Sequence, residues 1–399
     1  MKRLLSLILV LALSFCLVAC GEQSEPTPAP SNTDTTPSSQ GGSTTPVVSG
    51  DTWDEYGHPV VKDALKVGYM VQSSNSEATQ RSLQQAEVEC AHRGWELIEV
   101  VYEEDNNFRD SFQNLVNQGV DAIIIGSGSS QEAKIDLFVS ARKQGIGVYC
   151  NDNQVVDGII SNCTQSNGVA GMLLFYKIGE DYGWDMNICV VEGRQQQLMI
   201  ERVDPVVALI ESGAYPNLKL LDKVDYTTLG ESSAATATYK LAQTWLQKYG
   251  EEMNFIYTGA DTFGVNSAEA IAAAGDAHGD KWASCGIDGG NRAFAYLRND
   301  TPFHYSYCQP FELYTHNVFE IMNAIQVEGL NPGDAGCPIS RIGETVTATG
   351  FVCTKADTPP IGTNIHTIFD YYDASNKDAW YNWTDGPGPY VVQEWVKTS

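Results

Sequence analysis

Basic residues are scarce in this sequence. The 399 residues include 24 Lys and Arg against 50 Asp and Glu, which gives a formal net charge of −26 at pH 7. A surface that binds nucleic acid or an anionic membrane needs clustered positive charge, so the shortage argues against both targets. The same charge makes copies of the chain repel one another, and we therefore expect a monomer.

The residue groupings that catalysis or metal binding requires are also missing. No CxxC pair occurs, and the six histidines are scattered without the spacing of metal ligands. None of these histidines has an evident Ser or Cys partner for nucleophilic catalysis. Residues 126–128 read GSG, but the third glycine and the distant acidic residue of a dinucleotide-binding turn are absent. We predict no catalytic residue, no metal site and no cofactor.

Long apolar runs are absent except at the N-terminus. Residues 4–18 form one such run after Lys2 and Arg3, which is the length of a signal peptide and short for a membrane span. The run ends in LVACG at residues 17–21, which resembles a bacterial lipobox and predicts lipidation of Cys20; an ordinary signal with an incidental cysteine is the alternative. We assign residues 1–20 to the signal. The Pro-, Ser-, Thr- and Gly-rich residues 21–50 then form a flexible tether.

Eight further cysteines follow Cys20, and most lie in apolar runs typical of strands. Buried free thiols are the simpler interpretation. Cys337 and Cys353 are the first pair to test for a disulfide, because both lie in the loop-rich C-terminal part.

From residue 65 onward, short β-rich runs alternate with amphipathic stretches. The predicted strands cover residues 66–71, 95–101, 120–125, 146–150, 158–163, 187–191, 218–224, 254–258, 282–287 and 304–308. The predicted helices cover residues 76–93, 108–118, 131–144, 169–182, 198–212, 232–249, 266–274 and 311–328. Such alternation predicts two successive parallel sheets, which bind ligands beyond the carboxyl ends of their strands.

Five segments in this order resemble the type 1 periplasmic-binding-protein family, which includes the ribose and galactose receptors of ABC importers. They are LKVGYM at 65–70, VDAIII at 120–125, GIGVYCND at 145–152, SCGIDG at 284–289 and YCQP at 307–310. The resemblance implies an α/β fold of two Rossmann-like lobes, joined by a three-crossing hinge near 163–165, 309–311 and 345–350, with the ligand in the cleft. The N-terminal lobe is then 51–165 plus 310–345. The C-terminal lobe is 166–309 plus 346–399, with a strap around 379–383.

The same resemblance implies ligand contacts at five positions that match the family's motifs. They are Asp152, Arg202, Asp261, Asp288 and Gln309. Carboxylates accept hydrogen bonds from sugar hydroxyls, and a guanidinium supplies donors in a fixed plane. The structural alternatives are turn caps for Asp152 and Asp288, a surface ion pair for Arg202, a helix N-cap for Asp261 and hinge packing for Gln309.

The chain departs from the sugar receptors at three places. Asn153 stands where an arginine is frequent, and we expect it to contact the ligand through its side-chain amide without the charged fork. Ala260 stands where an asparagine precedes the aspartate. The first loop lacks the family's aromatic pair and offers Asn75 and Glu77 instead. An aromatic plate has to come from elsewhere, with Phe263, Trp184 and Tyr305 as candidates.

The resemblance implies a membrane-anchored binding protein that captures a monosaccharide or related polyol and delivers it to an ABC permease. The alternatives are a sensor of the same fold that feeds a membrane kinase or chemoreceptor, or a binder of a non-sugar ligand such as a nucleoside. An enzyme is disfavoured, because the sequence shows no nucleophile–base pair and no group of metal ligands. A repressor is excluded by the signal peptide, the acidic charge and the missing DNA-binding headpiece.

Overall fold

The computed structural model describes residues 53–72, 77–102, 105–128 and 130–355, all of which belong to one compact unit. None of the helices in these ranges is long and apolar enough to cross a membrane. The predicted signal, Cys20, the tether and the strap around 379–383 lie outside the described residues.

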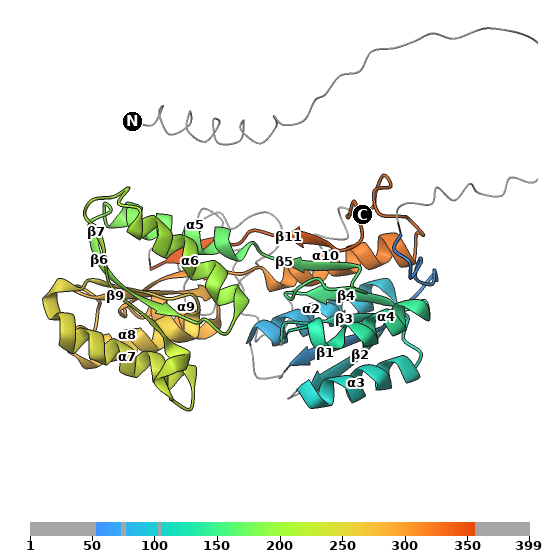
Figure 1. Cartoon of the computed structure of the whole chain (residues 1–399), viewed down its shortest axis with the longest axis horizontal. Helices are drawn as coiled ribbons and strands as arrows, with labels where there is room; N and C mark the ends of the chain where they lie inside the picture. Colours follow the sequence, from blue (N-terminus) through green and yellow to red (C-terminus); the bar gives the residue numbers. More distant parts are fainter. Residues whose placement is uncertain (1–52, 73–76, 103–104, 129, 356–399) are drawn as a thin grey trace, which may run out of the picture. The chain divides into compact units, whose positions relative to one another are not determined.

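The first lobe is built on a six-stranded sheet in the order β11-β5-β4-β3-β1-β2 (Figure 1). Its strands are β1 (Lys66–Gln72), β2 (Glu96–Tyr102), β3 (Ala122–Ile125), β4 (Gly147–Asn151), β5 (Ser161–Thr164) and β11 (Glu344–Thr347), and all neighbouring pairs are parallel. Its helices are α2 (Glu77–Arg93), α3 (Asp105–Asn117), α4 (Ile135–Lys143), which follows the short turn η1 (Glu132–Lys134), and α10 (Phe311–Gln326).

The second lobe repeats this order as β12-β10-β9-β8-β6-β7. Its strands are β6 (Met186–Glu192), β7 (Leu218–Asp225), β8 (Phe255–Tyr257), β9 (Ala283–Asp288), β10 (Phe303–Cys308) and β12 (Phe351–Thr354), of which only β12 pairs antiparallel. Its helices are α5 (Asn167–Asp181), α6 (Gln197–Glu211), α7 (Ala234–Tyr249), α8 (Asp261–Ala273) and α9 (Asn291–Arg298), with short turns η2 (Tyr226–Leu229) and η3 (Gly250–Glu252).

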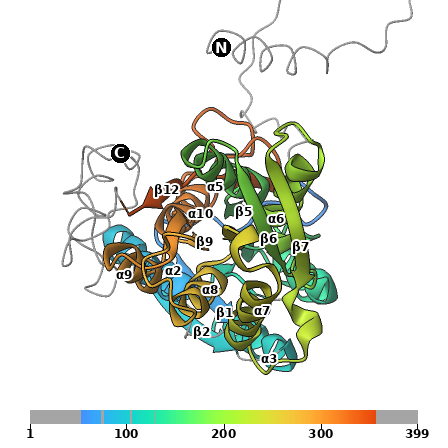
Figure 2. The ribbon, with the colours of Figure 1, turned by 90° about the vertical axis from the view of Figure 1, so that its left-hand side faces the viewer.

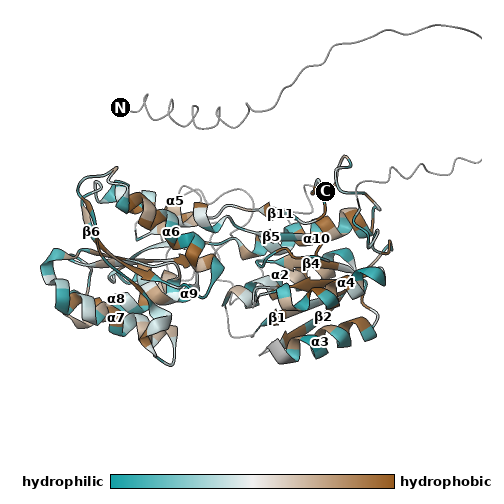
Figure 3. Cartoon of the chain, viewed as in Figure 1, coloured by the Kyte–Doolittle hydropathy of each residue, from teal (hydrophilic) through white to brown (hydrophobic). Residues whose placement is uncertain are grey.

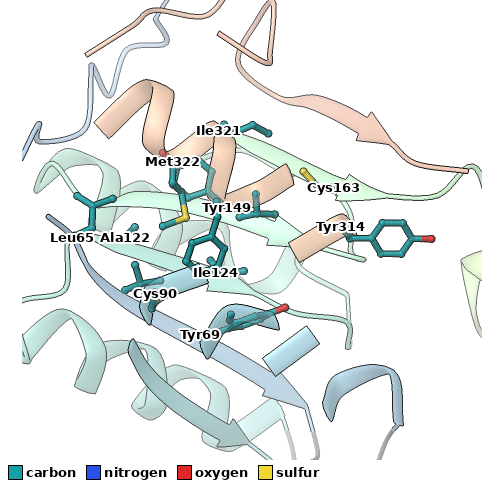
Figure 4. Packing of buried hydrophobic residues seen from close by; sticks show 14 of the residues in the cluster. Leu65, Tyr69, Cys90, Ala122, Ile124, Tyr149, Cys163, Tyr314, Ile321 and Met322 are labelled. Carbon is teal, nitrogen blue, oxygen red and sulfur yellow. The ribbon is translucent and has the colours of Figure 1, made fainter. Parts of the chain in front are cut away.

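Each sheet is covered on both faces, because successive strand residues point to opposite sides. In β6, Ile188 packs with α5 and α6, whereas Cys189 packs with α7 and α8. Figure 2 shows these helices around the sheet of the second lobe. In the first lobe, Ile124 joins the core under α2 and α10 (Figure 4), and Ile123 joins the core under α3 and α4. The central strands are accordingly apolar and the outer helix faces hydrophilic (Figure 3).

The chain passes between the two sheets three times. It leaves β5 for α5 through residues 165–166, leaves β10 for α10 through 309–310, and leaves β11 for β12 through 348–350. These connections confirm the predicted α/β fold of two Rossmann-like lobes with a three-crossing hinge. The last boundary, expected between 345 and 346, lies later because β11 pairs with β5 as far as Thr347.

The structure differs from the sequence-based prediction at two helices and two strands. Helix α9 and the strands β11 and β12 were not predicted, and α8 begins at Asp261 and not at residue 266. All eight described cysteines are free thiols. Seven of them are buried, in agreement with the simpler interpretation of buried free thiols. Cys337 packs against the core of the first lobe and Cys353 lies in a core of the second, so the pair named first for testing forms no disulfide.

Candidate ligand-binding site

A cavity of about 510 Å³ lies among the loops that follow the strands of both sheets. Six of the residues predicted from the sequence line it: Glu77, Asp152, Arg202, Asp261, Asp288 and Gln309. The first two belong to the first lobe, the next three to the second, and Gln309 lies on a crossing between them. The cavity therefore forms at the edge where open α/β sheets bind ligands.

Asp288 ends β9 in an unusual backbone conformation, with φ at 151°. L residues rarely adopt such angles, and they persist where the surrounding structure holds them. Its Oδ1 accepts a hydrogen bond from Gln309 Nε2 at 2.7 Å and lies 3.5 Å from Arg202 Nη1. Burial raises the pKa of this carboxyl group, while Arg202 and Gln309 oppose the rise.

Asp261 is the first residue of α8, but it does not cap that helix, whose N-cap position is Ala260 without a side-chain bond. Its Oδ1 accepts from Ser306 Oγ at 2.7 Å, and its Oδ2 accepts from the Gly290 amide at 3.0 Å. Burial, and then the charge of Asp288, raise its pKa to about 8. Asp261 thus ties α8 to the turn after β9.

Arg202 is a buried side chain in α6 and not a surface ion pair, since only 3% of the residue is exposed. Its Nε donates to Asn167 Oδ1 at 2.9 Å and its Nη1 donates to the Gly259 carbonyl at 3.0 Å. These two bonds fix the plane of the guanidinium beside Asp288.

Asp152 and Asn153 are neighbours on the first lobe, but only Asp152 lines the cavity. Asp152 reaches the cavity from a left-handed backbone with φ at 53°, and its Oδ1 accepts from Thr164 Oγ1 at 2.8 Å. Asn153 does not line the cavity; its Nδ2 donates to the Gly126 carbonyl, and its main chain is bonded to Asn162. Asn75 lies outside the described residues.

Residues 67–326, more than half of the chain, match the family described as "Periplasmic binding protein domain". The chain belongs to this family. Membership agrees with the expectation of a binding protein and not an enzyme, and it implies a location outside the cytoplasm. A comparison with curated proteins finds no match.

Solved periplasmic binding proteins share the fold at low sequence identity. The arabinose transporter component from Shewanella sp. ANA-3, bound to L-arabinofuranose, is 18% identical over 73% of this chain and 93% of its own, with a TM-score of 0.61. A solute-binding protein from Bacillus halodurans C-125 with bound myo-inositol is 16% identical over 74% and 97%, with a TM-score of 0.59. The arabinose-binding protein AraP from Geobacillus stearothermophilus is 16% identical over 74% and 98%, with a TM-score of 0.63.

The cavity of this periplasmic binding protein also holds residues that the sequence did not single out. They include Ser127, Gln196, Thr262, Arg292 and Phe311. Ser127 lies in the GSG turn after β3, a position that could have signalled it. Arg292 follows the Asp288 turn, but its helix was not predicted.

Two phenylalanines supply the apolar surface that the first loop lacks. Phe263 and Phe311 both line the cavity, from α8 and α10. The other two candidates for an aromatic plate make contacts elsewhere. Trp184 stacks on Tyr215 with ring centroids 3.8 Å apart, and the Tyr305 hydroxyl donates to Asp181. The cavity thus combines carboxylates, one fixed guanidinium and apolar ring surface.

Proposed function

We propose that this protein captures a small polyhydroxylated solute, a monosaccharide or related polyol, and delivers it to an ABC permease. The two lobes close on the solute about the three crossings, and the closed form is what the permease recognises. A lipid on Cys20 holds the protein at the membrane through the tether of residues 21–50.

The observation that carries the proposal is the mixed lining of the cavity. Asp152, Asp261 and Asp288 present acceptors from both lobes, and Arg202 presents donors in a fixed plane. Among the described residues, Gln309 Oε1 is a buried acceptor without a hydrogen-bond donor. Ligand hydroxyls both donate and accept, and the faces of a sugar ring or polyol are apolar, so such a ligand satisfies every one of these groups.

The solved relatives are consistent with this ligand class, because their bound molecules include L-arabinofuranose and myo-inositol. The sensor and nucleoside alternatives gain no specific support from the cavity. We therefore keep the transport of a sugar or polyol as the proposed function.

A thermal-shift screen of the purified protein against sugars, polyols, nucleosides and amino acids tests the ligand class. A ligand at 100 times its Kd stabilises the folded state by about 2.7 kcal/mol, which is a readily measured increase in Tm. We expect hits among pentoses, hexoses or cyclitols. Hits confined to nucleosides or amino acids overturn the ligand class.

The anchoring half of the proposal has its own test in the Cys20→Ser variant. We expect metabolic labelling with a fatty acid to mark the wild-type chain and not the variant, because the lipid is attached to the cysteine thiol. Undiminished label on the variant removes the anchor, and it leaves the ligand-binding proposal untouched.

A further inference from the structure

Helix α2 of the first lobe faces the turn that follows β9 in the second lobe (Figure 1). Glu77 and Arg81 are one helical turn apart on α2, a spacing that places both side chains on one face. The Glu77 Oε1 accepts a hydrogen bond from the backbone N–H of Asn291 at 2.6 Å. The Arg81 Nη1 lies 3.4 Å from the Gly289 carbonyl oxygen and 3.5 Å from that of Asp288. Helix α2 thus offers one hydrogen-bond acceptor to a backbone N–H group after β9 and donors to two backbone carbonyls of the same turn.

The Arg81 guanidinium is held rigidly by Glu312 in the first turn of α10. Its Nε and Nη2 donate to the two carboxylate oxygens, both at 2.7 Å, and the two side chains are 3% and 4% exposed. Its carbon lies 5.0 Å from the centre of the Phe311 ring. A bidentate pair fixes the plane of the guanidinium, so its other N–H groups point in set directions.

Those directions lead to the main chain of both Asp288 and Gln309. The Arg81 Nη2 donates to the Gln309 carbonyl at 3.1 Å. The Gln309 amide donates to the Asp288 carbonyl at 3.2 Å, and the two side chains are bonded at 2.7 Å. Asp288 has a φ angle of 151°, which L residues rarely adopt and which persists where surrounding contacts hold it.

We propose that Arg81, held by Glu312, is a positioning residue for the ligand site. From the first lobe it fixes the backbone that carries Asp288 and Gln309, and so sets the direction in which these side chains meet the ligand. The effect on affinity rests on the proposed function, whereas the effect on the turn does not need a ligand.

Hydrogen exchange in the unliganded protein tests the turn directly. In Arg81→Lys the charge that pairs with Glu312 remains, but the planar fork that reaches the carbonyls is lost. We expect amides in the peptide of residues 287–294 to exchange about 10-fold faster than in the wild type. The matched control is Arg142→Lys, because Arg142 is equally buried and pairs with Asp54 in the first lobe. The control should leave that peptide unchanged, and unchanged exchange in Arg81→Lys overturns the proposal.

A second variant keeps the test valid if the lysine misfolds. Arg81→Met combined with Glu312→Leu removes the pair without leaving a buried unpaired charge, a kind of replacement that proteins often tolerate. The same increase in exchange at residues 287–294 is expected, and its absence contradicts the role of Arg81.

A double-mutant cycle separates positioning from general stabilisation. The probes are L-arabinose and myo-inositol, titrated calorimetrically into the wild type, Arg81→Lys, Asp288→Asn and the double variant. We expect Arg81→Lys to weaken binding about 10-fold when Asp288 is present and by a clearly smaller factor when it is replaced, because only the positioning of Gln309 then remains to be lost. Equal losses in both backgrounds overturn the positioning role. If the thermal-shift screen finds no sugar or polyol that binds while exchange at the turn responds to Arg81→Lys, the proposed sugar class fails and the turn contact stands.

Discussion

Asp276 and Asp288 show how two aspartates at turns can serve different purposes. Asp276 accepts backbone N–H bonds from Asp280, Lys281 and Trp282 at 2.8–3.0 Å. Burial raises its pKa, but these bonds outweigh burial and lower it. Asp288 accepts from the Gln309 side chain and lies beside Arg202, but burial outweighs these contacts and leaves its pKa raised. The first is a turn cap, and the second is available to a ligand.

We predict that Asp288→Asn weakens ligand binding by about one to two orders of magnitude, because ligand hydroxyls lose a charged acceptor in a dry cavity. The unliganded Tm should remain nearly unchanged, since the variant keeps the shape and the bond from Gln309. Calorimetric titration and thermal unfolding measure the two effects.

The matched control is Asp276→Asn. It should lower the Tm and leave the affinity of the folded protein unchanged. If Asp288→Asn behaves in the same way as this control, Asp288 is a turn cap and not a ligand contact.

The raised pKa of Asp261 predicts a pH dependence of stability. Its carboxyl group has a pKa of about 8 in the folded protein against 3.8 in the reference state, so the folded chain binds the extra proton between these values. The contribution of this group to the free energy of unfolding therefore falls as the pH rises from about 4 to about 8, and it stays constant at higher pH.

We expect the Tm of the wild type to fall relative to that of Asp261→Asn between pH 5 and pH 9, because only the wild type has this carboxyl group to ionise. Thermal unfolding of both proteins across that range gives the difference. A difference that is independent of pH, or that has the opposite sign, contradicts the raised pKa.

At the scale of elements, the position of Arg202 depends on how closely α5 approaches α6. A Cβ atom on Gly171 of α5 would lie 2.1 Å from the Arg202 carbonyl oxygen, which is backbone and cannot move aside. The Tyr257 hydroxyl of β8 lies 3.2 Å from the carbonyl oxygens of both residues, and its one hydrogen is shared between them. The glycine therefore permits the contact that places α6, and with it the guanidinium, beside the cavity.

We predict that Gly171→Ala lowers the free energy of unfolding by about 1–3 kcal/mol, because it forces α5 and α6 apart. Chemical denaturation measures the loss. Gly168→Ala on the same helix is the control, since its Cβ would have no neighbour nearer than 3.6 Å. That variant should be neutral or gain up to about 1 kcal/mol from helix propensity. Equal effects of the two substitutions would falsify the packing argument.

At the scale of the molecule, three short connections join two lobes that each have their own cores. Short crossings of two or three residues leave few backbone angles about which the lobes turn. The residues of the cavity come from both lobes, so a ligand that binds them all favours the closed arrangement.

Small-angle scattering with and without a saturating ligand from the thermal-shift screen should therefore show a smaller radius of gyration in the liganded protein. An amino acid or nucleoside that gives no thermal shift serves as the control and should leave the radius unchanged. The same radius with and without bound ligand contradicts hinge closure and indicates a rigid scaffold.

The alternation of strands and helices was predictable because it rests on local periodicity. The positions of Asp152 and Asp288 were predictable for the same reason, since both stand at the carboxyl ends of apolar strands. Helix α9 was not predicted, because it has only eight residues. The three that are buried, Ala293, Phe294 and Leu297, make too short a pattern to recognise in the sequence. Phe311 was not predicted as a cavity residue either. Its helix was expected, but the sequence did not show which side of that helix faces the cavity.

The sequence by itself determined the strand–helix alternation of two α/β lobes and the strand ends that carry the acidic residues, because both follow from the order of apolar and polar residues along the chain. The three crossings were expected only from the resemblance to the type 1 periplasmic-binding-protein family. Only the tertiary structure decided which side chains share the cavity. Asn153 turns to the Gly126 carbonyl in the loop after β3, whereas Arg81, 207 positions before Asp288, contacts that residue's turn. The first contact depends on how neighbouring loops of one lobe pack and the second on how the two lobes pack, so no local pattern of residues encodes either.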